Sequence, residues 1–250
     1  MCYSTALRKK REEIEKRIYN LVPEEMELPN EFEPYFRLNG FTHGNLYIIK
    51  MDEQNKIHPA AWGLVPHWAA HNPVEFWKKS NTLNARSETI FEKASFKNSA
   101  EEGRCLILSD GFFEPHHENG VVIPHFCYQP TSAYPEGDLF LFAGLFSELN
   151  DGKLSATILT TEANDFFTEV HNKAKRMPLV LDKDLYEDWL DDGTNQQQLN
   201  ELMATGFTRN EFKAHPVSRD FYKKGIDTNL PYIIEHNNQD NGAKKLGTLF

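Results

Sequence analysis

The sequence lacks both a long hydrophobic run and the kind of N-terminal segment that directs proteins to secretion. Its longest apolar run, Leu139 to Phe146, is far shorter than the ~20 residues that a transmembrane helix needs. The residues after Met1 soon reach the basic run Arg8 to Arg11, where a secretory signal would have an apolar stretch. We therefore expect a cytoplasmic protein.

Cysteine is also scarce, with three in 250 residues, namely Cys2, Cys105 and Cys127. They form neither an even disulfide framework nor a CxxC metal motif, which fits a reducing compartment. The neighbouring His116 and His117 would point to opposite faces of a strand, and together with His125 they lack a cysteine or carboxylate cluster to complete a ligand set. The sequence predicts neither a metal site nor a cofactor.

The chain lacks the excess of positive charge that non-specific binding to nucleic acid requires. Its formal net charge is -10, so any contact with phosphates has to be local. Basic side chains gather at residues 8–11 with Arg17, at Arg86, and at Lys173, Lys175 and Arg176. Each of these patches is also compatible with an ordinary solvated helix or loop face.

The rest of the composition is that of an ordinary globular protein, with 40% hydrophobic and 26% charged residues. Branched and aromatic segments bounded by Gly, Pro, Asn or Asp predict strands at residues 45–50, 104–113, 120–128, 139–148 and 154–161. Apolar spacing and capping signals predict helices at residues 5–20, 87–101, 163–169, 183–190 and 196–205.

The order of these elements has no regular alternation of strand and helix, so we expect an α+β fold. The strand spacing predicts an antiparallel sheet that curls on itself in a barrel-like way, with helices at its flanks. We expect one domain over residues 1–230, followed by a flexible polar tail over residues 231–250.

Cysteine at position 2 would place an amine and a thiol on one residue once Met1 is removed, which a small second residue normally permits. An α-amine has a pKa near 7.7 to 8.0 against about 10.4 for lysine, so about 300-fold more of it is unprotonated at neutral pH. Such an amine can attack an aldehyde, and the adjacent thiol can then close a five-membered thiazolidine. Taken alone, Cys2 is also compatible with an incidental terminal residue.

Short motifs follow Cys2 along the chain: WGLVPHW at 62–68, NARSET at 84–89, SDGFFEP at 109–115, HNKAKRMPLVL at 171–181 and HPVS at 215–218. Each motif is weak by itself. Their presence in this order over most of the chain resembles the SRAP family, the SOS response associated peptidases that also process abasic sites in DNA.

The resemblance implies a protein of the DNA damage response that binds abasic sites in single-stranded DNA. Cys2 would form the covalent thiazolidine link to the ring-opened sugar, and Asn84 would hold the terminus in place. Glu114 and His171 would supply the acid and base chemistry that opens the sugar and expels water. Considered one at a time, Glu114 is also compatible with a salt-bridge partner and His171 with a loop residue.

The resemblance also implies residues that contact DNA. Arg86 would meet a phosphate, as guanidinium groups do well, and Arg176 would be a second basic contact. Trp62, Pro66 and Trp68 would wedge against unpaired bases, where stacking contributes about 1–3 kcal/mol per base. These three residues also fit a hydrophobic core, an interpretation that we favour for Trp62.

The chain departs from the family pattern beside the nucleophile. The family usually begins MCGR, whereas Tyr3 and Ser4 follow Cys2 here. An early glycine and a basic contact are therefore missing, unless Arg8 or Lys9 supplies the charge.

Two further segments differ or stand apart. The family commonly has tryptophan after Glu114, but this chain has Pro115, so packing around the carboxylate must differ. The C-terminal KLGTLF at residues 245–250 is compatible with docking on a partner in the replication machinery, such as a sliding clamp, and also with a frayed terminus.

Other functions remain open at this point. Cys2 and His171 are compatible with a cysteine peptidase acting on its own N-terminus, oriented by Asn84 or Glu114. The tryptophans and Arg86 are compatible with a non-covalent module for single-stranded DNA, and an imine at Cys2 with a lyase that cuts the strand. We expect a monomer that associates with the nucleoid when bound to DNA.

Overall fold

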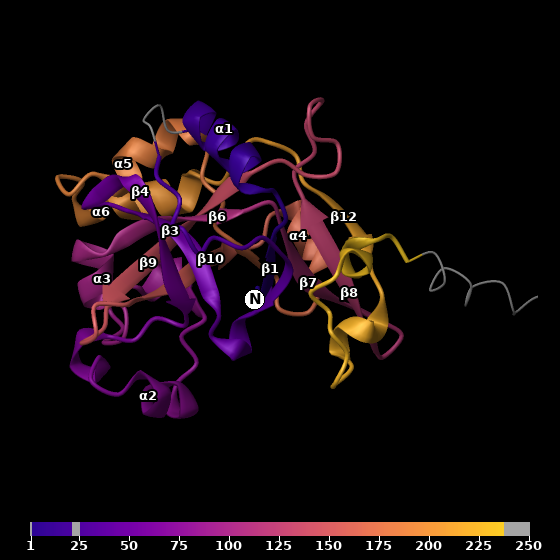
Figure 1. Cartoon of the computed structure of the whole chain (residues 1–250), viewed down its shortest axis with the longest axis horizontal. Helices are drawn as coiled ribbons and strands as arrows, with labels where there is room; N and C mark the ends of the chain where they lie inside the picture. The colour runs from indigo at the N-terminus through magenta and orange to yellow at the C-terminus, as the bar shows by residue number, and fades with distance from the viewer. Residues whose placement is uncertain (1, 22–25, 238–250) are drawn as a thin grey trace, which may run out of the picture.

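The computed structural model describes residues 2–21 and 26–237, which fold around two β-sheets lying side by side (Figure 1). The smaller sheet has the strand order β12-β8-β7-β1-β2, and all neighbours in it are antiparallel. Its strands are β1 (Ser4–Leu7), β2 (Tyr35–Asn39), β7 (Gly111–Glu118), β8 (Val121–Tyr128) and β12 (Lys213–Pro216).

The larger sheet curls until its ladder of hydrogen bonds returns on itself. Its order is β11-β10-β4-β3-β6-β9, and β10 also pairs with β9 and with β5, so pairing runs from β10 through β4, β3, β6 and β9 back to β10. Among the described strand pairs of this sheet, β10 pairs in parallel with β4 and β5, and the other pairs are antiparallel. The strands are β3 (Asn45–Lys50), β4 (Glu53–Trp62), β5 (Asn84–Arg86), β6 (Arg104–Ser109), β9 (Phe140–Glu148), β10 (Leu154–Glu162) and β11 (Arg176–Pro178).

Short helices cover the outside of the sheets (Figure 1). They are α1 (Arg11–Leu21), α2 (Pro73–Lys79), α3 (Lys97–Glu102), α4 (Asp165–Val170), α5 (Tyr186–Leu190) and α6 (Gln196–Thr205). Asparagine side chains accept backbone N–H bonds at the starts of α2, α4 and α6, namely Asn72, Asn164 and Asn195. These caps satisfy donors that the first helical turn leaves free.

Two large hydrophobic clusters fill most of the interior. One includes Trp189 and Leu141 and packs the larger sheet against α1, α5 and α6. The other contains Cys2 and centres on Phe112, whose ring contacts four further phenylalanines: Phe140, Phe142, Phe167 and Phe212. The Cys2 side of the molecule is therefore built on a rigid aromatic core, since aromatic pairs add to the free energy of simple burial.

The α+β class and the curled, mostly antiparallel sheet are confirmed, and the helix predicted at residues 196–205 has the bounds of α6. The helix predicted at residues 5–20 is wrong at its start, because Ser4 to Leu7 form a fully buried strand and α1 begins at Arg11. The helix predicted at residues 87–101 is largely wrong, because it reduces to α3 and a 3-10 turn at Ser87–Thr89. The predicted strand 104–113 is divided at Asp110 into β6 and β7.

Packing continues past the predicted domain end at residue 230. Ile233 is fully buried, and the ring Nε2 of His215 lies 2.7 Å from the carbonyl oxygen of Ile234. The rest of the predicted tail, with the KLGTLF segment, lies outside the described residues. Among the helices that the model describes, none is long and apolar enough to cross a membrane.

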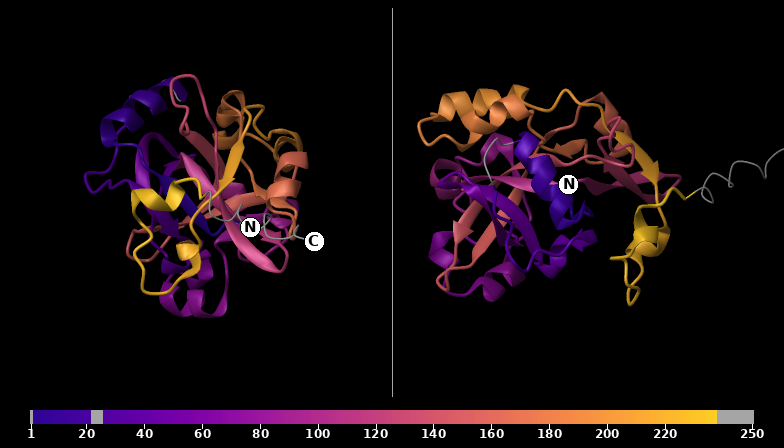
Figure 2. Two further views of the ribbon diagram at one scale, coloured as in Figure 1. Left: turned by 90° about the vertical axis from the view of Figure 1, so that its right-hand side faces the viewer. Right: turned by 45° about the horizontal axis from the view of Figure 1, so that its top comes forward.

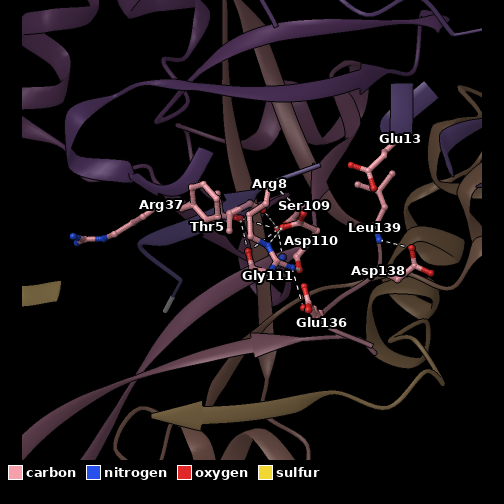
Figure 3. Close-up of polar contacts among 12 residues, drawn as sticks. Thr5, Arg8, Glu13, Arg37, Ser109, Asp110, Gly111, Glu136, Asp138 and Leu139 are labelled. Carbon is pink, nitrogen blue, oxygen red and sulfur yellow. Dashed lines mark hydrogen bonds and ion pairs between the residues drawn. The ribbon is translucent and has the colours of Figure 1, made fainter. Parts of the chain in front are cut away.

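Strand β1 is fastened to the bend between β6 and β7 by buried polar contacts (Figure 3). The hydroxyls of Thr5 and Ser109 lie 2.8 Å apart, and Asp110 accepts hydrogen bonds from the backbone N and the Nε of Arg8, both at 2.9 Å. The Asp110 side chain has no exposed surface. The SDG part of the SDGFFEP motif therefore holds the strand that carries Cys2.

These contacts also occupy most of the predicted N-terminal basic patch. Arg8 pairs with Asp110 and Arg17 with Asp138, and Lys9 is largely buried with its ammonium 4.0 Å from the ring centre of Tyr134. Arg8 and Lys9 therefore do not replace the basic residue that the family has next to its nucleophile. The interpretation of this cluster as a structural face is the one that the contacts favour.

Replacing Asp110 with alanine should lower the free energy of unfolding by about 3 kcal/mol, because it leaves the partly buried Nε of Arg8 and the Arg8 backbone N–H without their acceptor. Urea denaturation measures this difference. The matched control is Asp151→Ala, which breaks an exposed pair with Lys153 and should cost much less. Equal effects of the two substitutions would contradict the anchoring role.

Candidate active site at the N-terminal strand

Cys2 lies two residues before the start of β1 and has no exposed surface. Its thiol donates to the Ser4 carbonyl oxygen at 3.4 Å, and its own carbonyl oxygen accepts a 2.8 Å hydrogen bond from Nδ2 of Asn84. Asn84 is the first residue of β5. This strand pairs with β10, where Ile158 lies opposite Asn84. A side chain of the larger sheet therefore holds the main chain of Cys2 in place.

Glu114 and His171 meet behind this strand. Nδ1 of His171 lies 3.1 Å from Oε2 of Glu114 and 3.0 Å from the carbonyl oxygen of Arg176. A ring nitrogen between two oxygen acceptors carries the hydrogen itself, so Nδ1 is the protonated nitrogen and Nε2 is left as the basic one. Both side chains are almost fully buried, with exposed fractions of 4% for His171 and 0% for Glu114.

Local structure places the two residues. Glu114 lies on β7, where it is paired in register with His125 of β8. His171 ends α4, because its backbone leaves the helical region while its N–H still bonds to the carbonyl oxygen of Phe167. The aromatic core around Phe167 therefore fixes the end of the helix and, with it, the imidazole.

Burial sets the protonation of this pair. Removal from water raises the pKa of Glu114 to about 7 and lowers the pKa of His171 to about 4, since burial disfavours the charged form of both groups. Near neutral pH the imidazole is therefore neutral and a large share of the carboxyl groups is protonated. A carboxylic acid and a neutral imidazole side by side can act as a proton donor and a proton acceptor.

The thiol beside them is not activated. Burial, followed by the charge of Glu114, raises the pKa of Cys2 well above its ordinary value, against the weaker opposing effect of the Ser4 and Phe113 backbone. The same charge contributes to the raised pKa of Cys127. Cys2 is thus a protonated thiol near Glu114, and the better first nucleophile on this residue is its nitrogen once that becomes a free amine.

Two cavities of about 470 Å³ each meet at Tyr3. We call them the β2 cavity and the β5 cavity. The β2 cavity reaches Glu114 and is lined mainly by β2, the turn after it and the segment at residues 221–228. The β5 cavity is lined by residues around β5, among them Asn84, Arg86 and Lys93. The candidate site therefore has open space on both sides of the N-terminal strand.

Arg86 is exposed at the end of β5 and lines the β5 cavity, where an anion could reach it. Trp68 is also exposed, at 53%, and its ring lies edge-on to Phe76. Trp68 is not among the described residues that line either cavity at Tyr3. The structure thus brings Arg86 to the Cys2 site and leaves Trp68 apart from these two cavities.

Trp62 requires a correction as a DNA-contacting residue. It has no exposed surface, and its indole N–H donates to the Leu83 carbonyl oxygen at 2.8 Å. It is a core residue that cannot stack on a base. Pro66 is likewise buried, and the cavity that it lines includes His67 and Phe146 and neither Cys2 nor Glu114.

Arg176 requires the same correction. Its guanidinium forms a two-pronged ion pair with Glu88, with distances of 2.7 and 3.0 Å, and donates to the Thr160 carbonyl oxygen at 2.6 Å. Its side chain is only 12% exposed. Arg176 therefore joins β10 and β11 to the turn after β5, and its main-chain oxygen orients His171.

Sequence reasoning missed the residues that build the β2 cavity, chiefly Arg37, Phe41 and Tyr222. None of them lies in one of the motifs, and residues 221–228 are far along the chain from Cys2. The unusual Tyr3 was the available signal, since it is the residue that both cavities share.

The histidines that follow Glu114 have structural partners. The ring of His116 lies 4.9 Å from that of His125, and its Nδ1 lies 3.1 Å from the Glu169 carbonyl oxygen. Over the part of the chain that the model covers, no group of three or more His, Cys, Asp or Glu residues is arranged to hold a metal ion.

Residues 1–224 match the family model described as SOS response associated peptidase (SRAP), and the chain belongs to this family. The family prediction from the motifs is therefore confirmed.

Several relatives carry the name abasic site processing protein. YoaM of Bacillus subtilis is 28% identical over 193 residues, covering 75% of this chain and 79% of YoaM. YedK of Escherichia coli is 28% identical over 200 residues, covering 78% of this chain and 83% of YedK. HMCES of Gallus gallus is 34% identical over 151 residues, covering 52% of this chain and 44% of HMCES.

The fold also matches a crystal structure of a protein from Bacteroides thetaiotaomicron, with a TM-score of 0.77 and 26% identity. That match covers 94% of this chain and 100% of the other. The order of strands and helices around the site is therefore shared with a known structure.

Replacing Glu114 with glutamine should change how stability depends on pH. A carboxyl group whose folded pKa is raised from about 4.3 to about 7 makes the wild type lose stability as the pH rises between these values. The variant lacks this loss, so its free energy of unfolding should increase relative to wild type by about 3 kcal/mol from pH 4.5 to pH 7.

His171 has the opposite sign, because its lowered pKa makes stability increase with pH between about 4 and 6.5, and it is common to both proteins. Urea denaturation at a series of pH values checks the difference, with N-termini verified by intact mass. The matched control is Glu92→Gln, the same substitution at an exposed position. A constant difference for Glu114→Gln would contradict the protonated carboxyl.

Proposed function

We propose that this protein, once Met1 is removed, captures abasic sites in single-stranded DNA through a thiazolidine at Cys2. The observation that carries the proposal is the 2.8 Å hydrogen bond from Asn84 to the Cys2 carbonyl oxygen, which fixes the N-terminal residue beside Glu114 and its partner His171. The names of the relatives support the choice of substrate.

The first step uses the amine. An abasic deoxyribose rests mainly as a closed hemiacetal, so a proton must move before the aldehyde is free. The carboxyl of Glu114, with its pKa of about 7, and the neutral imidazole of His171 suit this transfer. The unprotonated amine of Cys2 then adds to the aldehyde carbon to form a carbinolamine.

The second step expels water and closes the ring. A proton from Glu114 converts the carbinolamine hydroxyl into water, which departs and leaves an imine. The Cys2 sulfur then adds to the carbon of the protonated imine, which makes the nitrogen neutral, and the thiol proton returns to the Glu114 carboxylate. The net change is the loss of one water from protein plus DNA, so no oxidant or cofactor is needed.

Removal of Met1 is a condition of the reaction, because the Cys2 nitrogen is otherwise part of a peptide bond and cannot add to an aldehyde. Cys2 itself is buried in the described structure. The same burial argues against a general cysteine peptidase, which needs a thiolate at neutral pH. A protonated thiol is compatible with the thiazolidine route, since sulfur acts only after the imine has formed.

The acidic chain meets DNA locally in this proposal. Arg86, exposed beside Asn84 on β5, is positioned to bind a phosphate near the nucleophile. Trp68 is a second exposed aromatic residue for unpaired bases outside the two cavities. Cleavage of the DNA strand by elimination from the same imine is the lyase variant of this reaction.

Mixing the protein with single-stranded DNA that carries one abasic site should give a product that survives denaturing gels. Its mass should equal the protein without Met1 plus the DNA minus one water. Cys2→Ala should abolish the stable product, because the remaining amine forms only a reversible imine. Cys105→Ala, which removes another buried thiol, should leave the yield unchanged. An undiminished product from Cys2→Ala would end this proposal.

Glu114→Gln and His171→Asn should each slow formation of the adduct by about 100-fold, as expected for loss of a general acid or base. Intact-mass measurement on the same variants separates this function from autoproteolysis. Removal of Met1 should remain complete in both variants if an ordinary aminopeptidase performs it. Retention of Met1 in both would favour the autopeptidase.

A further inference from the structure

The β2 cavity is a preformed pocket next to the candidate active site. It has a volume of about 470 Å³, within the range of about 300–1,000 Å³ that is usual for small-molecule sites. Glu114 forms part of its lining, so an occupant would lie beside the residue that handles protons. The abasic sugar itself has no base to fill such a pocket.

Aromatic rings form two of its walls. Tyr3 and Phe41 pack with ring centres 5.1 Å apart, and Phe221 and Tyr222 with centres 5.0 Å apart. Phe41 is 59% exposed and Tyr222 is 48% exposed. Aromatic rings left open on the walls of a pocket are the usual platforms on which unpaired bases stack.

Cations complete the lining, in a protein whose net charge is -10. They are Arg37, Lys223 and Lys224. Burial raises the pKa of Tyr222 to about 12, although the positive charge of Arg37 acts in the opposite direction. The phenol therefore stays neutral and does not repel an anion. A group of positive charges next to aromatic walls matches a base linked to a phosphate.

The wall formed by the C-terminal segment is held in place. The guanidinium of Arg37 lies 3.7 Å above the ring of Phe221 and donates to Oγ1 of Thr228 at 2.6 Å and to Oγ of Ser4 at 3.3 Å. Oδ1 of Asn229 accepts from the backbone nitrogens of β2 at 2.8 and 3.1 Å. A pocket fixed in this way costs little conformational entropy to fill.

The segment that carries this wall follows β12 and passes along one end of the molecule (Figure 1, Figure 2). Its 3-10 turn at Arg219–Tyr222 is capped by the Ser218 side chain, which accepts from the Asp220 nitrogen. Phe221 also packs on Phe113, the residue before Glu114. The wall therefore shares its support with the catalytic strand β7.

We propose that the β2 cavity binds the unpaired nucleotide directly next to the abasic site, with its base against Tyr222 and its phosphate at Lys223 and Lys224. This inference rests on the proposed function, because it supplies the neighbour of the captured sugar. Tyr3 would separate the base from the sugar at Cys2. The base next to the lesion would then hold the strand in register while Cys2 reacts.

The test uses wild-type protein and short single strands with a tetrahydrofuran analogue at the centre, which has no aldehyde and cannot react. Fluorescence anisotropy gives the dissociation constant. Removing the base from the neighbouring nucleotide, first on the 5′ side and then on the 3′ side, should weaken binding about tenfold on one of the two sides, as expected for a lost stacked base.

Variants at Tyr222 test whether the cavity causes this effect. Tyr222→Ala should bind the intact strand about tenfold more weakly and should no longer respond to removal of the neighbouring base. Tyr222→Phe keeps the ring and should behave as wild type. Tyr19→Ala, which removes a tyrosine that is 58% exposed on α1, is the matched control and should also retain the response.

The lysines are tested through salt dependence. Each phosphate contact on a single strand contributes about 0.7 to the slope of log affinity against log salt concentration. Lys223→Gln with Lys224→Gln should therefore reduce the slope by about 0.7 to 1.4. The double control Lys10→Gln with Lys213→Gln, two lysines that do not line the β2 cavity as described, should leave it unchanged.

Failure of this inference is distinct from failure of the proposed function. If the adduct at Cys2 forms but binding is indifferent to both neighbouring bases, or if Tyr222→Ala keeps the response, the cavity does not hold a base. If the response depends on Tyr222 while no adduct forms with an abasic site, the pocket is correct and the covalent reaction is not.

Discussion

A carboxylate with no contact with water holds the N-terminal strand in place. Asp110 accepts hydrogen bonds from the backbone and side chain of Arg8, and Thr5 bonds to the neighbouring Ser109. Strand β1 is short, and its pairing with β2 and β7 covers few residues. Without this fastening the first residues of the chain would fray, as termini usually do. Every role considered for Cys2 depends on this strand being ordered.

A second constraint is the removal of water from the site. The aromatic core around Phe112 excludes water from the space behind Cys2, and this one property moves the pKa of Glu114 up and that of His171 down. Both groups become neutral, since at weakly acidic pH the carboxyl carries the proton that an exposed histidine would carry. The fold thus creates an acid and a base at neutral pH from two ordinary residues.

Sequence reasoning predicted the family and the fold class. It also named Cys2, Asn84, Glu114 and His171, which the structure brings together, because their segments in this order resemble the SRAP family. It mistook Thr5 to Leu7 for helix, because a strand this short is too brief to outweigh the helical spacing that follows it.

Residues whose role depends on distant contacts were harder to predict. Arg176 looked like a free cation until folding paired it with Glu88, which is 88 positions away. The tryptophan at position 62 was equally ambiguous, because burial is a property of the whole fold. The wall at Tyr222 had no local signal at all, since only the return of the chain after β12 brings it to Glu114.

The burial of Cys2 has a consequence for the lifetime of the protein. Peroxide and other oxidants attack thiolates that they can reach, and the sulfur here is both covered and protonated. Under the proposed function, the protein would work under the same oxidative stress that damages DNA. A buried and protonated thiol resists oxidation under such conditions.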